Sequence, residues 1–507
     1  MSTMLTPAGA LALVTARDGN GIHASAGNMY GNAIFGRDSL EVAEDLIQTH
    51  PELVRRILLN VASMQGVGFN PESEEEPGRI LHEYRPNQIE GQELKGVARV
   101  IYEELSSKWG GTDKYMIYYG SVDSTPLFIK VLCSFADYKG IDVFSEKYID
   151  RRGEEVTLWH ALEAATNWLR NRLHGDSNGL LSFKRSNPHG LINQVWKDSW
   201  EFYVHEDGSE INHDGPVASI ELQGLAYDAL MSAVKYLPDT EDLHHIAEHI
   251  TSETIRRFWM PDKAYFSVGI DTDEQGNLRP IKVITANPGA LLNSSIFDNL
   301  SELHKRRYVS AIVRKLFSED LLTNAGIRSR ALSEGRLRPH WDYHGSFVTW
   351  PKETFDIATG LRRQGLFRLA LQLEFRLLNL VWRAQAYPEF AYIDGQGRAL
   401  LGPQSNHDGD DVITVRSTDH PEDIQAWTVS AVISTLNRLG ITSDSDEWHQ
   451  ELQSEILQHI PITRPLATGE ELMDYLPQHP YRIEANKTDR LKQGAAEMVP
   501  EFKSISH

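Results

Sequence analysis

The 507-residue sequence contains a single cysteine, Cys133, so the chain can form no internal disulfide. A chain without disulfides fits a reducing compartment. The N-terminus lacks a basic leader followed by an apolar stretch, and no run reaches the roughly 18 apolar residues that a membrane-spanning helix needs. These absences predict a cytoplasmic protein that has no membrane partner.

Basic residues are scarce relative to acidic ones. The chain has 50 Lys and Arg against 71 Asp and Glu, which gives a formal net charge of −21. This charge repels a phosphate backbone and no long basic stretch compensates for it, so nucleic acid is not an expected partner. Zinc-spaced Cys or His clusters and a glycine-rich phosphate loop are also missing. We therefore expect neither a metal nor a cofactor, and we expect carboxylates to perform the chemistry.

Helical periodicity dominates the sequence. From Trp159 to Leu173 apolar residues recur at spacings of three and four, and Gly175 follows as a stop signal. No alternation of strands and helices indicates a parallel sheet, although short runs such as 263–270 predict hairpins within loops. Including 159–173, the sequence predicts eleven helices, the other ten at 39–49, 51–64, 91–106, 123–137, 219–236, 241–259, 303–317, 353–361, 364–382 and 424–439.

The predicted helices belong to one all-α domain. No segment rich in Pro, Gly or Ser separates two self-contained halves, and apolar periodicity fades from about residue 461. We therefore predict a single helical domain over 1–460 and a C-terminal surface extension over 461–507. Long polar connections link the helices, and connections of that length are usually functional.

The strongest local signal lies in one of these connections, in QVWKDSW at 194–200. Trp196 and Trp200 flank Lys197 and Asp198, and exposing two tryptophans around a carboxylate is costly unless they line a cleft. An apolar cleft raises a carboxyl pKa, as a general acid requires. The alternative is a buried tryptophan pair with a structural salt bridge between Lys197 and Asp198.

A second carboxylate, Glu389, stands among aromatic residues in AYPEFAY at 386–392. If Glu389 faces Asp198 across a gap that fits a sugar, one carboxyl can protonate the leaving oxygen while the other activates water. That division of labour is typical of inverting glycosidases. Taken alone, Glu389 also fits a loop-surface carboxylate.

Two acidic residues stand at predicted helix starts. In FGRDSL (35–40), Asp38 can accept hydrogen bonds from two sugar hydroxyls while Arg37 holds it in place. Asp123 stands in a similar position in YYGSVDSTPLF (118–128), near Tyr119. Helix capping, by Asp38 or Ser39 and by Asp123, is the alternative for both sites.

Two further segments combine polar and aromatic residues. Glu221 lies among apolar residues at the first turn of a predicted helix, where the helix dipole favours an anion. The loop RPHWDYHGSFVTWP (338–351) contains Tyr343, His344 and Trp350. This loop fits either a platform on which a sugar ring stacks or a segment that packs into the core.

Nine motifs in this order resemble the amylo-α-1,6-glucosidase module of glycogen debranching enzymes and their bacterial relatives. The resemblance extends from about residue 31 to 440, and it implies an (α/α)₆ barrel, inversion at the anomeric carbon and no cofactor. The barrel's loops would build a pocket for a terminal glucose. The motifs are FGRDSL, EPGRILHEYR, YYGSVDSTPLF, QVWKDSW, ASIELQGL, TANPGALL, YHGSFVTWP, YPEF and DIQAWT.

The resemblance also implies roles for single residues. The family's general acid follows a Trp-any-Asp pattern, here Trp196-Lys197-Asp198. Its base follows Leu-Pro-Glu, here Tyr387-Pro388-Glu389, so the leucine is replaced. The glucose-binding wall of the family corresponds to Arg37, Asp38, Asp123, Glu221, His344 and Trp350, beside which the local patterns add Tyr119, Trp196, Lys197 and Tyr343.

Only about 30 residues precede the first motif, so we expect neither a glucanotransferase module nor an N-terminal β-sandwich. This favours small oligosaccharide or glycoside substrates over glycogen. The hypothesis is an inverting exo-α-glucosidase that acts on α-1,6-linked or other short α-glucosides. One alternative is a hydrolase of glucosylglycerate or mannosylglycerate, whose carboxylate would need a cation from Arg85, Arg328 or Lys352. The other is a noncatalytic carbohydrate sensor.

Overall fold

The computed structural model describes residues 4–450 apart from 17–20, 28–29, 31–32, 90, 239, 338–341, 402–420 and 446–447. The predicted C-terminal extension, 461–507, lies outside the described residues. Over the described part the chain is mostly helical, and its strands are short and antiparallel.

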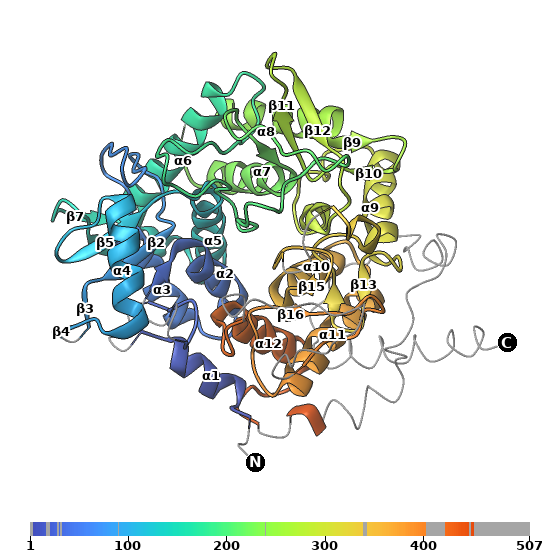
Figure 1. Cartoon of the computed structure of the whole chain (residues 1–507). Coiled ribbons are helices and arrows are strands. Elements are labelled where there is room, and N and C mark those ends of the chain that lie inside the picture. Colours follow the sequence, from blue (N-terminus) through green and yellow to red (C-terminus); the bar gives the residue numbers. More distant parts are fainter. Residues whose placement is uncertain are drawn as a thin grey trace.

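Six elements form a closed inner ring around one axis (Figure 1). Each packs against the next in chain order, and the last packs against the first. Five are α-helices and one is a short 3₁₀ helix. They are α2 (Gly36–Leu46), α5 (Ser124–Lys139), α7 (Ile220–Val234), η2 (Asn287–Leu292), α10 (Pro351–Arg363) and α12 (Ala426–Leu439).

A second layer of helices surrounds this ring. Each outer helix packs on the inner element next to it in the sequence, except that α1 closes the layer by packing on α12. The outer helices are α1 (Pro7–Val14), α3 (Pro51–Ser63), α6 (Leu158–Gly175), α8 (Glu241–Phe258), α9 (Glu302–Leu316) and α11 (Phe367–Ala384). The alternation of inner and outer elements confirms the predicted (α/α)₆ barrel, and α4 (Gly96–Trp109) packs outside it against β5.

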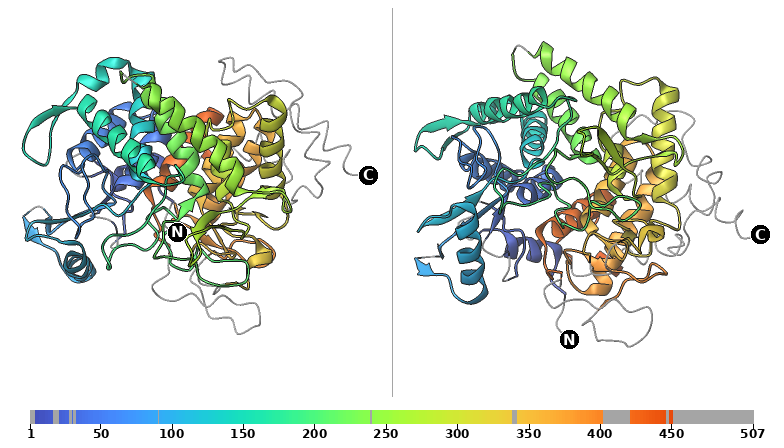
Figure 2. Two further views of the ribbon diagram at one scale, coloured as in Figure 1. Left: turned by 90° about the horizontal axis from the view of Figure 1, so that it is seen from above. Right: turned by 45° about the horizontal axis from the view of Figure 1, so that its top comes forward.

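Most of the strands and long loops gather at one end of the barrel (Figure 2). The hairpin over 147–157 instead belongs to the connection that joins the C-terminal end of α5 to the start of α6. Two sheets have three strands, in the orders β1-β2-β5 and β12-β11-β8, and the others are two-stranded. The strands are β1 (Ile34–Phe35), β2 (Glu83–Pro86), β3 (Gln88–Ile89), β4 (Gln92–Glu93), β5 (Tyr115–Tyr118), β6 (Lys147–Ile149), β7 (Glu155–Thr157), β8 (Ala218–Ser219), β9 (Trp259–Met260), β10 (Tyr265–Phe266), β11 (Gly269–Thr272), β12 (Leu278–Ile281), β13 (Leu322–Thr323), β14 (Gly326–Ile327), β15 (Val348–Thr349) and β16 (Ala391–Tyr392), and two short 3₁₀ helices are η1 (Ile141–Ser145) and η3 (Leu332–Glu334).

All eleven predicted helices are present, with ends displaced by up to five residues. The sequence reading missed α1, whose apolar residues are not confined to one face. The largest displacement is at α4, which begins at Gly96. The predicted run 263–270 forms β10 and the start of β11.

The start of α2 corrects the capping interpretation. This helix begins at Gly36 with Phe35 as its N-cap residue and no side-chain cap, so Asp38 and Ser39 lie inside the helix. A Cβ atom at Gly36 would lie 2.1 Å from the backbone oxygen of Leu81. Glycine therefore allows α2 to begin in close contact with the segment that leads into β2, and this contact places Arg37 and Asp38 at the loop end of the barrel.

Candidate active site

A cavity of about 190 Å³ lies at the loop end of the barrel. It contains both predicted catalytic carboxyls, Asp198 from the connection between α6 and α7 and Glu389 from the connection between α11 and α12. Its walls are mainly aromatic. The lining residues are Ala24, Tyr30, Phe35, Arg37, Asp38, His82, Trp196, Asp198, Tyr343, His344, Trp350, Glu389, Phe390, Gln425 and Trp427.

Asp198 is held by the aromatic loop that follows η3. The hydroxyl of Tyr343 donates to Asp198 Oδ1 at 2.9 Å. Burial raises the pKa of Asp198, while the charge of Arg37 and the Tyr343 hydrogen bond act in the opposite direction. The carboxyl is therefore oriented and keeps its proton to a higher pH than a solvated aspartate.

Glu389 lies in a more negative part of the cavity. The backbone N–H of Glu422 donates to Glu389 Oε2 at 3.3 Å. Burial raises the pKa of Glu389 to about 8, and the nearby charges of Asp38, Glu422 and Asp198 add to this effect. Because ionisation of one carboxyl raises the pKa of the next, these groups titrate together. The cavity can thus hold one protonated and one ionised carboxyl at the same time.

The ion pair at the start of α2 differs from the expected one. Arg37 Nη1 donates to Asp123 Oδ2 at 3.0 Å, so Arg37 holds Asp123, not Asp38. Asp38 instead accepts from Gln425 Nε2 at 3.2 Å, and burial raises its pKa to about 7. Asp123 occupies the N-cap position of α5 but makes no side-chain cap, since Ser121 and Arg37 bind its carboxylate.

The segment before Asp198 is anchored to the inner helices. Trp196 lines the cavity, and its Nε1 donates to Glu221 Oε1 at 2.8 Å. Lys197 is fully buried and its Nζ binds Glu353 Oε1 at 2.6 Å, so the alternative salt bridge with Asp198 is wrong. Lys197 does not line the cavity, and it therefore anchors the chain instead of facing the substrate space.

Trp200 does not flank the acid. Its side chain is 49% exposed and does not line the catalytic cavity, so the expectation of a tryptophan on each side of Asp198 holds for Trp196 alone.

The loop before α10 forms one wall of the cavity. His344 Nδ1 lies 3.1 Å from Ser199 Oγ, which donates to Asp342 Oδ1 at 3.1 Å. Burial lowers the pKa of His344 well below its usual value, so the ring is neutral. Trp350 stacks on His344 with ring centres 4.9 Å apart. His340 and Trp341 of the same motif lie outside the described residues.

Tyr119 is buried in the core and does not line the cavity. Its buried hydroxyl donates to the backbone oxygen of Met64 at 2.8 Å and accepts from Arg151 Nη1 at 2.8 Å. The structure therefore separates Tyr119 from the residues that line the catalytic cavity.

Several lining residues were missed by the sequence reading. Five of them stand within the nine motifs, where a lone aromatic, histidine or glutamine side chain gives no local sign of a wall position. These five are Phe35, His82, Phe390, Gln425 and Trp427. Tyr30 precedes the first motif and gave no signal.

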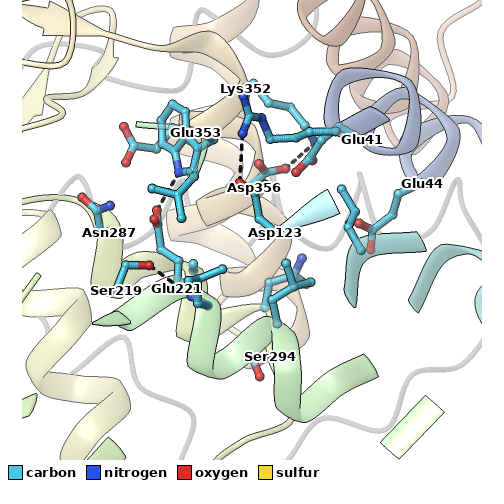
Figure 3. A pocket seen from close by; sticks show the side chains of 18 of the residues that line it. Glu41, Glu44, Asp123, Ser219, Glu221, Asn287, Ser294, Lys352, Glu353 and Asp356 are labelled. Atoms are coloured by element: carbon cyan, nitrogen blue, oxygen red, sulfur yellow. Dashed lines mark hydrogen bonds and ion pairs between the residues drawn. The ribbon is translucent and has the colours of Figure 1, made fainter. Parts of the chain in front are cut away.

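A second cavity, of about 150 Å³, lies on the barrel axis and is lined by all six inner elements (Figure 3). Asp123 and Glu221 line this axial cavity and not the catalytic one. Burial raises the pKa of Glu221 to about 7. Three residues, Arg37, Trp196 and Trp427, line both cavities, and we call them the partition.

No group of three or more His, Cys, Asp or Glu side chains in the described part of the chain is arranged to hold a metal ion. No helix in the same part is long and apolar enough to cross a membrane.

Comparisons with known proteins add evidence on the fold. No protein-family model matches the chain, and no curated protein matches it in sequence. Solved structures do match. A GH63 mannosylglycerate hydrolase from Thermus thermophilus, in complex with glucose, is 14% identical with a TM-score of 0.53, and the match covers 85% of this chain and 99% of that one.

Two other solved structures match over a similar length. An uncharacterized conserved protein from Thermus thermophilus is 12% identical with a TM-score of 0.54, over 86% of this chain and 99% of that one. A wild-type glycosidase is 12% identical with a TM-score of 0.51, over 86% and 96%. At such low identity these matches show a shared fold, and the function must be argued from the site.

Proposed function

We propose that the protein is an inverting, exo-acting glycoside hydrolase that cleaves short α-glucosides, including α-1,6-linked ones. The observation that carries this proposal is the presence of Asp198 and Glu389, each with a raised pKa, in one cavity with aromatic walls. Aromatic faces suit sugar rings, and paired carboxyls supply the acid and the base of glycoside hydrolysis.

Asp198 is the general acid in this proposal. It gives its proton to the glycosidic oxygen as the bond from that oxygen to the anomeric carbon breaks. Glu389 takes a proton from a water molecule whose oxygen attacks the anomeric carbon from the opposite face. The products are a sugar of inverted configuration and the free alcohol. Room for the water predicts carboxyl groups roughly 6.5–9.5 Å apart.

The other polar wall residues bind hydroxyl groups of the sugar in this proposal. Asp38 and His344 line the catalytic cavity, and Arg37 lies between them and the axial cavity. The negative charges of ionised Asp38 and Glu389 suit the positive charge that develops on the sugar ring during cleavage.

A hydrolase of glycosylglycerates is the second candidate, and the fold match to a mannosylglycerate hydrolase favours it. The walls of the cavity favour a neutral substrate instead. Among the described wall residues Arg37 is the one Lys or Arg side chain, and it is paired with Asp123. The three cations nominated from the sequence bind elsewhere: Arg85 binds Glu83, Arg328 binds the backbone oxygens of Ser346 and Asp394, and Lys352 binds Glu41, Asp45 and Asp356.

The test is sugar release from isomaltose, panose, a glycogen limit dextrin, and the matched pair glucosylglycerol and glucosylglycerate, with Asp198→Asn in parallel. The anomer first released is identified by proton NMR. Release from the neutral α-glucosides, lost in the variant and with inverted configuration, supports the proposal. Preference for glucosylglycerate over glucosylglycerol would support the second candidate, and retained configuration would refute inversion. A noncatalytic sensor would bind sugar and release none.

A further inference from the structure

The axial cavity is a shaft about two helical turns deep. Three inner helices line it with pairs of residues seven positions apart, and seven residues of α-helix rise roughly 10 Å. The first residue of each pair lies at the end of the barrel that carries the catalytic cavity, and the second residue lies deeper in the barrel core. The pairs are Arg37 and Glu44 on α2, Asp123 and Lys130 at α5, and Glu221 and Asp228 on α7.

The lower part of the shaft is charged. Lys352 binds Glu41 at 2.9 Å and Asp356 at 2.6 Å (Figure 3). Lys130 binds Glu44 at 2.7 Å. Apolar residues would fill a dry barrel core at lower cost, because buried ions lose their hydration. Four of the six inner elements, α2, α5, α7 and α10, present charged side chains to the cavity, beside apolar residues such as Leu225 and Ile357. These charges favour water in the cavity.

The accessibility of these side chains supports hydration. The side chain of Asp356 keeps 34% of its accessible surface, and those of Glu44 and Glu41 keep 26% and 23%, although all three lie among the inner helices. A polar cavity of roughly 10–15 Å³ can hold one water molecule, and each molecule of liquid water occupies about 30 Å³. The volume of about 150 Å³ leaves room for several molecules.

The three residues of the partition line both cavities and so form the boundary between the shaft and the catalytic cavity. Two buried N–H groups of the partition, Arg37 Nε and Trp427 Nε1, have no hydrogen-bond acceptor in the described part of the chain. Unpaired buried donors are costly and are commonly satisfied by ordered water. The boundary between the two cavities therefore offers binding positions to water.

We propose that the axial cavity is a water-filled shaft that supplies the hydrolytic water through the partition. This inference rests on the proposed glycosidase function. Each cleavage consumes one water molecule: its oxygen bonds to the anomeric carbon, one proton goes to Glu389, and the proton of Asp198 goes to the leaving oxygen. A terminal sugar that fills the catalytic cavity blocks water from the loop end, whereas the shaft still reaches the site from below.

The test fills the shaft without touching the catalytic cavity. Ala290 of η2 lines the shaft and lies outside the catalytic wall, so Ala290→Leu narrows the shaft, and Ala290→Ser is the matched control that leaves it open and polar. We expect Ala290→Leu to lower kcat at least about fivefold without raising KM, and Ala290→Ser to keep the wild-type kcat. Glucose affinity, measured by calorimetry, should be equal in all three proteins.

Crystal structures of the three proteins give an independent reading. Ordered water in the shaft of the wild type and of Ala290→Ser, and its loss in Ala290→Leu, is expected. If Ala290→Leu does not fold, Leu225→Phe on α7 narrows the same shaft. An unchanged kcat in a variant with a filled shaft, an equal loss in both Ala290 variants, or a dry shaft in the wild type would overturn the inference. Absence of hydrolysis by the wild type would refute the proposed function instead, and the crystallographic reading would still stand.

Discussion

Replacing Lys197 by methionine removes the ammonium group from a fully buried ion pair next to the proposed general acid. Lys197 Nζ lies 2.6 Å from Glu353 Oε1 and 3.1 Å from Asn287 Oδ1. Its own side chain is 0% exposed and that of Glu353 is 6% exposed. The variant leaves Glu353 with Ser329 as its remaining side-chain hydrogen-bond donor among the described residues, at 3.1 Å. Removal of one partner from a buried pair costs about 3–5 kcal/mol.

The loss of stability should depend on pH. Burial raises the pKa of Glu353, and Lys197 opposes this effect, so the folded-state pKa of Glu353 rises further in the variant. A carboxyl whose folded pKa lies above its unfolded value destabilises the protein as pH rises from the unfolded toward the folded pKa. Lys197→Met should therefore be less destabilised at pH 5 than at pH 8.

Urea denaturation at both pH values is the assay. Lys197→Met/Glu353→Gln should recover part of the stability because it removes the uncompensated charge. Lys147→Met is the matched control, since the Lys147–Glu155 pair is exposed and its loss should have no measurable effect. A free energy of unfolding for Lys197→Met within about 1 kcal/mol of wild type at pH 8 would refute the reasoning, because a pair so deeply buried cannot be lost at that cost.

Three further predictions concern the carboxyls. Asp198→Asn should keep most activity on a glycosyl fluoride, whose leaving group needs no proton, and should lose at least about a hundredfold on isomaltose. Glu389→Gln should lose activity on both substrates. Fluoride release and glucose release measure the two reactions. Asp38→Asn removes a charge that raises the pKa of Glu389, so the acidic limb of the pH profile of kcat/KM should move to lower pH. Asp356→Asn should raise the thermal midpoint at pH 8 more than at pH 5, because burial raises the pKa of Asp356 and its ionisation opposes folding.

The helices were predictable because an amphipathic helix repeats its apolar residues every three or four positions whatever its partners are. The missed helix, α1, is apolar on several faces, so its sequence has no such repeat. Loop residues have no such repeat, so their positions can be predicted only where a neighbour in the same segment gives a signal. The place of Asp198 in the cavity was predictable because Trp196, in the same segment, marks a wall. The partner of Lys197, in contrast, is 156 positions away in α10, where no local pattern indicates it.

Contacts between residues far apart in sequence also explain why the predicted partners of the binding-wall residues were wrong. Arg37 and Asp38 are adjacent in sequence, yet successive residues of a helix point about 100° apart. Arg37 therefore points to Asp123 just before α5, and Asp38 points to Gln425 just before α12. Tyr119 is close to Asp123 in sequence, but its hydroxyl binds Met64 after α3. Helix periodicity fixes which face is buried, and the neighbouring helices decide which partner each polar side chain meets.

The position of the site follows from the direction of the inner helices. Each contributes residues near its N-terminus to the cavities: Arg37 and Asp38 on α2, Asp123 before α5, Glu221 on α7 and Trp427 on α12. The partial positive charges of these helix ends converge on one region and offset part of the cost of burying carboxylates there. The same field opposes a neutral, protonated carboxyl, yet burial still raises the pKa of Asp38, Glu221 and the proposed acid, Asp198. The loss of hydration therefore outweighs the helix dipoles, and the region gains the protonated carboxyl that acid catalysis requires.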